Sequence, residues 1–326
     1  MCVNSYSPDT PLGRQALASY NAAFTEQTWL NKIKQAETYL TFALIYGFDI
    51  LTPTIADACT FVQYLVNSLQ SPTSRKNYLS GARWWILERG GDPTALTSRE
   101  AKAVERGAIR LSPHVTTPAP PLHPTDLVKV AQALDNIQDG YIYKAALTMG
   151  YFGFLRTSNL LAPRAALWGG THTLKRHDVI IHNTGLLLII RSSKTIRLGT
   201  TPPTISLPTI PGSPVCPTAA WKAYVTRVPA HPASNAFIMT DGTHLTNNRL
   251  ITVLRATLLA LGSPHALTTT SHSLRRGGSQ AAQLAGAAHQ DIQAHGTWKA
   301  KGSLKTYLAQ QSSERVAHSM AHLFAP

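Results

Sequence analysis

The stretch at residues 270–287, TSHSLRRGGSQAAQLAGA, carries the most informative local pattern in the chain. His272 and Arg275 lie three residues apart, so on a helix both side chains project from the same face. Thr270 or Ser271 is placed to cap that helix, and the exposed amides of a helix start favour an anion. The stretch therefore predicts a helix whose first turn binds a phosphate, although surface helices also show such a pair by chance.

A second segment, GYFGFLRTSNLL at 150–161, places Arg156 directly after an aromatic and aliphatic run. A guanidinium that emerges from buried chain costs desolvation energy unless it meets an anionic partner. The positions just after Arg156 offer Asn159 and no acid. This composition favours a ligand over an internal carboxylate as the partner of Arg156.

Two further segments each add candidates. RSSKTIRLG at 191–199 places Lys194 in a turn after an apolar strand, where a lysine is usually just solvated. AHGTWKAKGSLKTYLAQ at 294–310 holds Trp298 and Tyr307. On an unbroken helix nine residues rotate by about 900 degrees, so the two rings share a site only if the backbone bends, and Gly302 permits a bend. Taken alone, Tyr307 is also compatible with an ordinary core position.

In chain order the candidates are Arg156, Lys194, His272, Arg275, Trp298 and Tyr307. This set resembles the tyrosine recombinase, or phage integrase, family, whose site runs Arg, Lys in a hairpin, HxxR, His or Trp, then Tyr. Three motifs are most similar to those of eukaryotic mobile-element recombinases of the crypton and DIRS type: GFLRTSNLLAP, HSLRRGG and HGTW. The resemblance implies a site-specific recombinase or integrase of a mobile element, which cuts and rejoins DNA through a covalent 3'-phosphotyrosine.

The resemblance also implies a role for each candidate residue. Two arginines clamp the phosphate, the tyrosine attacks it, the lysine is the general acid, and His272 and Trp298 contact the phosphate. No cofactor or metal is implied; His318 and His322 stand at i, i+4, but two ligands are too few for a metal site. The sequence departs from the family pattern twice, with Asn159 where many members carry an acid and Arg276 where a histidine is common.

The first third of the chain predicts a helical bundle. Apolar residues recur at three- and four-residue steps in TEQTWLNKIKQAETYLTFAL, and Thr54 and Asp57 form a capping-box pattern before the next apolar face. Helices are also expected in RKNYLSGARWWILERG at 75–90, which Gly90 and Gly91 end, and near 98–109. We expect an N-terminal tail at 1–20 and a helical core-binding domain, which binds DNA, at 21–111.

A linker and a second domain should follow. Five prolines in LSPHVTTPAPPLHP predict a linker at 112–122, and a catalytic domain is expected at 123–310. It should hold helices and a hairpin formed by DVIIH and LLLIIRS, with PTISLP as a third strand. The predicted fold class is mainly α with a small antiparallel β-sheet, the α+β catalytic domain following the N-terminal bundle. Helices are expected near 125–134, 141–153, 218–228 and 247–261.

A last helix is expected at 311–326, with Val316, Met320, Leu323 and Phe324 on one apolar stripe. This stripe either packs on its own domain or docks on a neighbouring subunit. Family analogy favours the docking in trans, within a homotetramer around two DNA duplexes.

The charge of the chain points to a polyanionic partner. Of its 326 residues 30 are Lys or Arg and 16 Asp or Glu, a net charge of +14. Residues 1–122 hold 11 basic against 9 acidic residues, whereas 123–326 hold 19 against 7. A general solubility charge is the alternative, but with the motifs this asymmetry favours double-stranded DNA. The residues expected to contact DNA are Arg75, Lys76, Arg83 and Arg276.

Other features narrow the class of protein. No apolar run approaches the roughly 18 residues of a membrane span, and residues 1–14 do not resemble a secretion signal. Three scattered cysteines do not form a disulfide framework or a metal knuckle. We expect a soluble protein of the nucleus in a eukaryotic host, or of the cytoplasm and nucleoid in a prokaryote. Two alternatives stay open: a type IB topoisomerase-like enzyme, and an inactive DNA-binding protein of recombinase descent.

Overall fold

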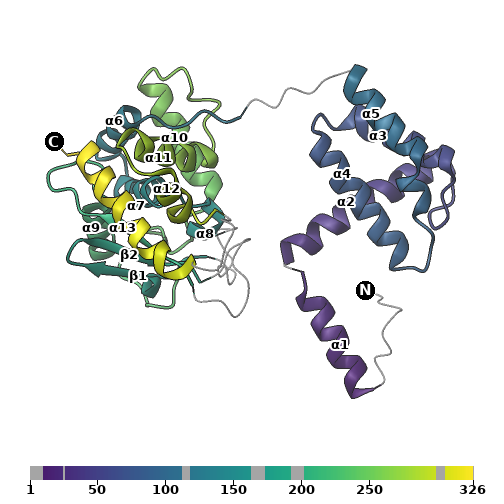
Figure 1. The fold of residues 1–326 in the computed structure, drawn as a ribbon, viewed down its shortest axis with the longest axis horizontal. Coiled ribbons are helices and arrows are strands. Elements are labelled where there is room, and N and C mark those ends of the chain that lie inside the picture. Colours follow the sequence, from purple (N-terminus) through teal and green to yellow (C-terminus); the bar gives the residue numbers. More distant parts are fainter. Residues whose placement is uncertain are drawn as a thin grey trace. The chain divides into compact units, whose positions relative to one another are not determined.

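The computed structural model describes residues 10–24, 26–111, 118–162, 173–191, 202–298 and 305–325; for Glu26 and residues 305–312 only the backbone is described. The chain divides into two compact units, Met1–Thr117 and Pro118–Pro326 (Figure 1). We call them the N-terminal unit and the C-terminal unit. The boundary between them falls inside the segment 112–122, where the sequence predicts a linker.

The N-terminal unit is helical. Its main core contains Tyr39, Phe42, Phe61 and Leu65, all fully buried. Thr54 and Asp57 form the predicted capping box at the start of α3. A Cβ at Gly81 would overlap the Gln35 side chain, so α4 approaches α2 closely there. The elements are α1 (Pro11–Ala22), α2 (Glu26–Tyr46), α3 (Ile55–Ser68), α4 (Pro72–Leu87), the 3-10 turn η1 (Thr94–Thr97) and α5 (Arg99–Leu111).

Helix α1 begins inside the segment 1–20, which the sequence predicts to be a tail, and ends two residues after it, at Ala22. The Thr10 hydroxyl accepts a hydrogen bond from the Gly13 amide, and Pro11 occupies the first helical position. No residue of α1 is buried, which explains why an apolar pattern did not predict it. Aromatic contacts of Tyr20 with Phe24 and Trp29, at 5.9 and 6.0 Å between ring centroids, join α1 to α2.

The C-terminal unit combines helices with a small sheet, so the predicted fold class is confirmed. In the described residues the strand order is β1–β2–β3, all antiparallel, with Val179 opposite Leu188 and Leu186 opposite Leu207. The predicted hairpin and third strand are therefore present. The elements are α6 (Pro124–Leu134), α7 (Gly140–Phe152), α8 (Thr157–Leu160), η2 (Arg176–Asp178), β1 (Val179–His182), β2 (Gly185–Ile189), β3 (Thr204–Pro208), α9 (Pro217–Arg227), α10 (Asn247–Ala260), α11 (Ser271–Leu284), α12 (His289–His295) and α13 (Lys305–Leu323).

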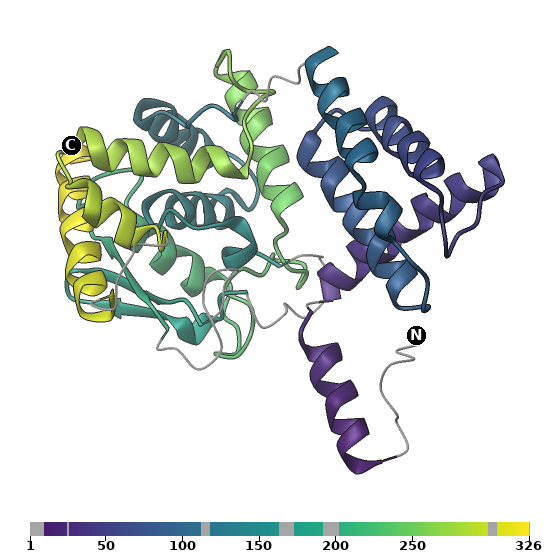
Figure 2. The same ribbon diagram turned by 45° about the vertical axis from the view of Figure 1, so that its right-hand side comes forward.

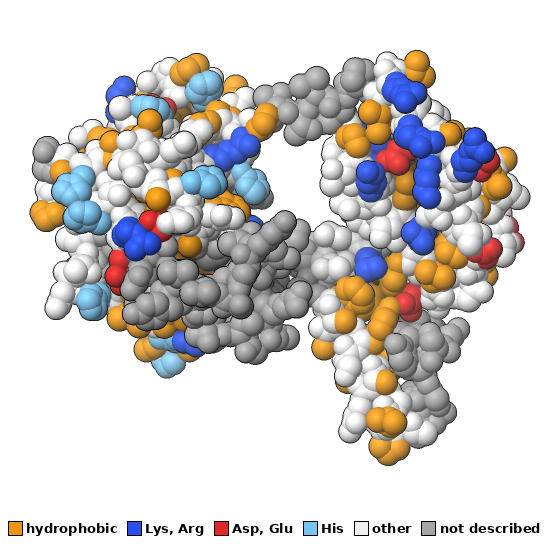
Figure 3. Space-filling view, in the orientation of Figure 1, with side chains coloured by type: hydrophobic (Ala, Val, Ile, Leu, Met, Phe, Trp, Pro, Cys, Tyr) orange, Lys and Arg blue, Asp and Glu red, His pale blue; other side chains and the backbone are white. Residues whose placement is uncertain are grey.

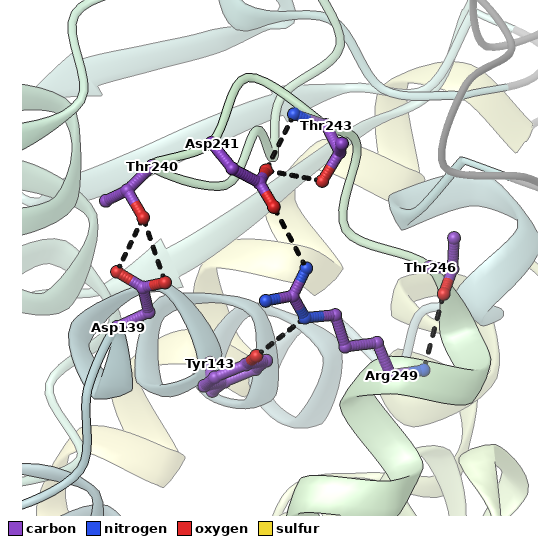
Figure 4. Close-up of polar contacts among 7 residues, drawn as sticks. All are labelled: Asp139, Tyr143, Thr240, Asp241, Thr243, Thr246 and Arg249. Atoms are coloured by element: carbon purple, nitrogen blue, oxygen red, sulfur yellow. Dashed lines mark hydrogen bonds and ion pairs between the residues drawn. The ribbon is translucent and has the colours of Figure 1, made fainter.

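Helix α7 is the centre of the C-terminal unit. Eleven of its residues are buried, and α6, α9, α10 and α11 pack around it (Figure 2). A polar network fixes its N-terminal end: Thr240 donates to Asp139 at 3.0 Å, and Arg249 donates to the Tyr143 hydroxyl at 3.0 Å and pairs with Asp241 (Figure 4). This network anchors the N-terminal end of α7, and burial of the helix as far as Phe152 holds its C-terminal end in the core.

Helix α13 packs on its own unit, against α12 and β3. Val316 and Met320 are fully buried in the main core, and the Phe324 ring lies 5.1 Å from that of Phe152. Arg315 donates to both carboxylate oxygens of Asp291 at 2.7 Å. In this chain the apolar stripe packs on its own domain, one of the two arrangements that the sequence left open. Its docking on a neighbouring subunit stays a prediction.

Candidate active site

Arg275 lies on α11 and is a buried residue, with 7% exposure. The helix begins with a capping box between Thr270 and Ser273, which confirms Thr270 as the cap. The guanidinium donates to the carbonyl of Phe154, and to that of Gly296 at 2.6 Å. These two carbonyls belong to separate segments, so Arg275 joins the end of the α7 region to the turn after α12.

The glycine pair after Arg275 brings α11 close to its neighbours. A Cβ at Gly277 would lie 2.1 Å from the Leu122 carbonyl oxygen, and one at Gly278 would lie 2.0 Å from that of Tyr151. Neither backbone atom has room to move in a packed core. The two glycines of the RRGG motif are therefore required for steric reasons. Only glycine at these positions lets α11 approach α7 closely enough to place Arg275 in the pocket.

Arg156 enters the same region from the start of α8, where it is the N-cap residue. It follows Phe154, whose φ of 47° is in the left-handed region, an uncommon conformation for a residue with a Cβ. Arg156, Asn159, Arg275 and Gly296 line one pocket. The prediction that Arg156 and Arg275 converge is thus in agreement with the geometry.

The electrostatics of this pocket favour an anion. Burial, and secondly the positive charge of Arg156, lower the pKa of Arg275 to about 10, so the guanidinium is still charged at neutral pH. No acidic side chain is among the lining residues that the structure describes. Two like charges next to each other with no carboxylate between them are relieved by a bound anion such as a phosphate.

Trp298 covers the Arg275 guanidinium, with 4.3 Å between the guanidinium carbon and the ring centroid. A Cβ at Gly296 would lie 2.2 Å from the indole, and Thr297 has a φ of 52°. The turn Gly296–Trp298 is therefore built so that the indole packs on the arginine. Trp298 is half-buried, which leaves part of the ring accessible.

His272 is in the first turn of α11, one turn before Arg275, and is exposed. Its backbone amide donates to the Thr270 hydroxyl at 3.2 Å. The described lining of the pocket does not include it. The structure places His272 beside the pocket on the same helix as Arg275, but does not place its imidazole in the pocket.

Two predicted residues lie outside what the structure describes. Lys194 falls in the segment 192–201, and of Tyr307 only the backbone is described, in the first turn of α13. Since α12 ends at His295 and α13 begins at Lys305, Trp298 and Tyr307 do not share one helix. Their roles stay predictions.

Asn159, which stands where many family members carry an acid, is buried and lines the same pocket as Arg156. Its backbone amide donates to the Arg156 carbonyl at 2.8 Å, and its carbonyl accepts from Leu174 at 2.8 Å. These bonds tie the short helix α8 to the chain that leads into the sheet. Asn159 thus supports the segment that carries Arg156.

Sequence reasoning missed two residues next to the pocket, His295 and Ser313. His295 has 1% exposure, and its Nδ1 lies 3.0 Å from the Ser313 hydroxyl. His295 is part of the HGTW motif, but the family resemblance assigns a role only to Trp298 in that motif. The signal for Ser313 is absent from the local sequence because its partner is 18 residues away.

The residues predicted to contact DNA fall into two groups. Lys76 and Arg83 are exposed on α4, and Arg276 is exposed on α11, where it donates to the Ala119 carbonyl at 2.7 Å. Arg75 is different, with 5% exposure and hydrogen bonds to the carbonyls of Leu69 and Gln70. The prediction that Arg75 contacts DNA does not fit the structure, because its guanidinium closes the C-terminal end of α3.

A basic face on α5 was also missed. Its cations occur at steps of three, four and four residues, so they share one side of the helix, and all are exposed. Figure 3 shows Lys and Arg side chains gathered over α5 and α4 on the visible face of the N-terminal unit. We call the following residues the α5 stripe: Arg99, Lys102, Arg106 and Arg110.

The described residues contain no group of three or more His, Cys, Asp or Glu side chains placed to share a metal ion. Within the same ranges, every helix is too short or too polar to cross a membrane.

Comparison with known proteins rests on structure alone. No protein-family model matches the sequence, and no curated protein matches it either. Among solved structures, the Tn1549 transposon integrase in complex with transposon right end DNA has a TM-score of 0.55 and 14% identity, over 93% of this chain and 98% of that one. A lambda integrase dimer bound to a COC' core site has the same TM-score and identity, over 93% and 96%.

The XerH site-specific recombinase bound to difH substrate is similar at a TM-score of 0.52 and 15% identity, over 86% of this chain and 73% of that one. At such identities the likeness concerns the fold. The chain therefore has the tyrosine recombinase fold, a helical unit joined to a mostly helical unit with a small antiparallel sheet.

Proposed function

We propose that this chain is a tyrosine recombinase, which cuts and rejoins double-stranded DNA through a covalent 3'-phosphotyrosine. The observation that carries the proposal is the pair Arg156 and Arg275, which line one pocket with no acidic side chain among its described lining. The tyrosine recombinase fold and the candidate nucleophile Tyr307 in the first turn of α13 add to it.

The chemistry of phosphodiester cleavage assigns a task to each group. Arg156 and Arg275 bind the nonbridging oxygens, whose charge is more concentrated in the pentacoordinate transition state than in the substrate. The Tyr307 hydroxyl attacks phosphorus, forming a P–O bond to tyrosine while the bond to the 5'-oxygen breaks. Lys194 gives its proton to that leaving oxygen, and His272 takes the phenol proton.

Rejoining follows from the same intermediate. The phosphotyrosine keeps the energy of the broken diester, so the 5'-hydroxyl of another strand can reverse the step without ATP. Trp298 holds Arg275 from the side and donates its indole N–H to phosphate. The side chains supply all the positive charge that this route uses, so the proposal includes no metal or cofactor.

We also propose how the protein binds DNA, how it assembles and in which kind of mobile element it acts. DNA is bound by both units, with the exposed cations Lys76, Arg83 and Arg276 on its backbone. A homotetramer on two duplexes would exchange the strands. The sequence motifs support an origin of this chain in a mobile element of the crypton or DIRS type, which would act in the nucleus of a eukaryotic host.

Covalent trapping tests the proposal without a known target site. Purified protein is incubated with sheared, nicked genomic DNA of the organism that encodes it, and DNA that stays attached after denaturation is sequenced. We expect attached fragments that share a common sequence, and none with Tyr307→Phe, although that variant still binds DNA. Absence of attached DNA would favour an inactive DNA-binding protein, and relaxation of supercoils without joined recombinants would favour a topoisomerase.

A further inference from the structure

His295 is a buried titratable residue to which the proposed mechanism assigns no role. It ends α12, directly before the turn that carries Trp298, and its ring packs on that of Phe154 at 4.5 Å between centroids. Its Nε2 lies 2.8 Å from the Phe152 carbonyl oxygen, and its Nδ1 lies 3.0 Å from the Ser313 hydroxyl. Both ring nitrogens are therefore engaged.

The partners of His295 fix its tautomer. The Phe152 carbonyl can only accept, so Nε2 carries the hydrogen, and Nδ1 of the neutral ring accepts from the Ser313 hydroxyl. The Ser313 oxygen in turn accepts from the Ser206 amide at 2.6 Å. Burial, opposed only partly by these bonds, lowers the pKa of His295 to about 4, so the ring is neutral at physiological pH. The result is a directed chain from β3 through α13 and α12 to the end of α7.

One end of this chain is shared with the arginine pocket. The Phe152 carbonyl accepts from His295, and the Phe154 carbonyl, two residues on, accepts from Arg275. The same segment continues into Arg156. On the other side, Gly296 follows His295 and accepts from Arg275. His295 and Arg275 thus hold the same two segments from different sides.

The other end of the chain is on the helix that carries the candidate nucleophile. Ser313 is fully buried, and it is the first residue of α13 whose side chain the structure describes. Tyr307 precedes it by six residues, or roughly 9 Å along a helix. The other described anchors of α13, which include Arg315, Val316 and Met320, lie further along the helix from Tyr307.

We infer that Ser313 and His295 are positioning residues, which tie α13 and its tyrosine to the arginine pocket of the same subunit. The inference rests on the proposed function, because it concerns the delivery of Tyr307 to phosphorus. Neither residue touches the DNA. They set the distance between the attacking group and the arginine clamp, on which the rate of attack depends steeply.

The test separates delivery of the tyrosine from activation of the phosphate. The substrate is a nicked duplex with the sequence recovered by trapping. The first assay measures the rate of covalent adduct formation. The second uses the Tyr307→Phe background with added hydrogen peroxide, whose hydroperoxide anion attacks phosphorus while the bond to the 5'-oxygen breaks and that oxygen gains a proton. This cleavage needs the arginines and does not need α13 to deliver a tyrosine.

Ser313→Ala should slow adduct formation at least tenfold, with peroxide cleavage and DNA affinity within twofold of the parent. Ser319→Ala, on the same helix and half-buried, is the matched control and should change neither assay. His295→Gln keeps a donor for Phe152 and should show the same selective loss, with thermal melts to verify folding. An equal loss in both assays, or no loss in either, would overturn the inference. If the unmutated protein forms no adduct and the Tyr307→Phe background shows no peroxide cleavage, the proposed function itself has failed.

Discussion

Arg75 and Arg275 are buried to nearly the same extent, at 5% and 7% exposure, and both donate to backbone carbonyls. Their surroundings differ. Arg75 closes the end of α3, where it donates to the carbonyls of Leu69 and Gln70. Arg275 lies next to Arg156, lines a pocket and is covered by Trp298. A buried guanidinium is therefore a functional candidate when it lines a pocket next to a second cation, and a structural group when its hydrogen bonds close the end of a helix.

The largest expected effect distinguishes the functional arginine, Arg275, from the structural one, Arg75. Arg275→Lys loses the planar fork that holds two carbonyls and a phosphate, so adduct formation should fall by a factor on the order of 1,000. Arg75→Lys should leave the adduct rate per folded molecule unchanged and lower the free energy of unfolding by about 1–2 kcal/mol. Adduct kinetics and denaturant melts of both variants check this. Equal losses of cleavage in both would contradict the distinction.

The steric basis of the pocket predicts the next effect. Gly278→Ala places a Cβ against the Tyr151 carbonyl and should destabilise the C-terminal unit by about 3 kcal/mol. Gly107→Ala is the control, because no atom lies within 4 Å of its Cβ in the middle of α5. It should stabilise the N-terminal unit by about 0.5–1 kcal/mol. Denaturant unfolding measures both, and the same sign for the two substitutions would refute the account of the RRGG segment.

The pH dependence of the free energy of unfolding tests the surroundings of Arg275, because His295 titrates next to it. Burial, aided by the positive Arg275, lowers the pKa of His295 to about 4, whereas the unfolded chain has an ordinary histidine pKa of about 6.5. The unfolded state therefore binds the proton first, and stability falls as pH drops from about 6.5 to 4, by on the order of 3 kcal/mol. His295→Gln should lack this component in urea melts across that range. An unchanged pH profile in the variant would place the titration elsewhere.

Among the expectations met, the local patterns did best. The capping box at Thr54, the hairpin around Gly185 and the Thr270 cap are set by neighbouring residues, and the structure has each of them. Which face of a helix is buried depends on distant partners. That is why Arg75 was predicted to contact DNA, although its side chain is buried.

At the candidate active site too, the sequence predicts only those residues that belong to a recognisable motif. Arg156 and Arg275 could be paired through the family pattern, and their shared pocket agrees with it. His295 and Ser313 could not, because their contact exists only when α12 and α13 pack together. The hydrogen-bond chain through them is a tertiary feature with no signature in either segment.

The smallest effect concerns exposed cations, the opposite case to the two buried arginines. If the α5 stripe contacts DNA phosphates, Arg106→Gln should weaken DNA binding several-fold for all sequences and reduce the slope of log affinity against log salt by about 1. Arg227→Gln removes an exposed arginine from α9, in the other unit, and serves as the charge-matched control. Fluorescence anisotropy at several salt concentrations measures both slopes. Equal slopes for Arg106→Gln and the unmutated protein would remove α5 from the interface.

The most direct measurement identifies the residue that carries the DNA. The covalent complex is digested with protease and nuclease, and mass spectrometry locates the peptide that bears a nucleotide. The account predicts a phosphate ester on Tyr307, in a peptide that begins within α13 or just before it. A nucleotide on any other residue would contradict the convergence of Arg156, Arg275 and Tyr307 on one phosphate.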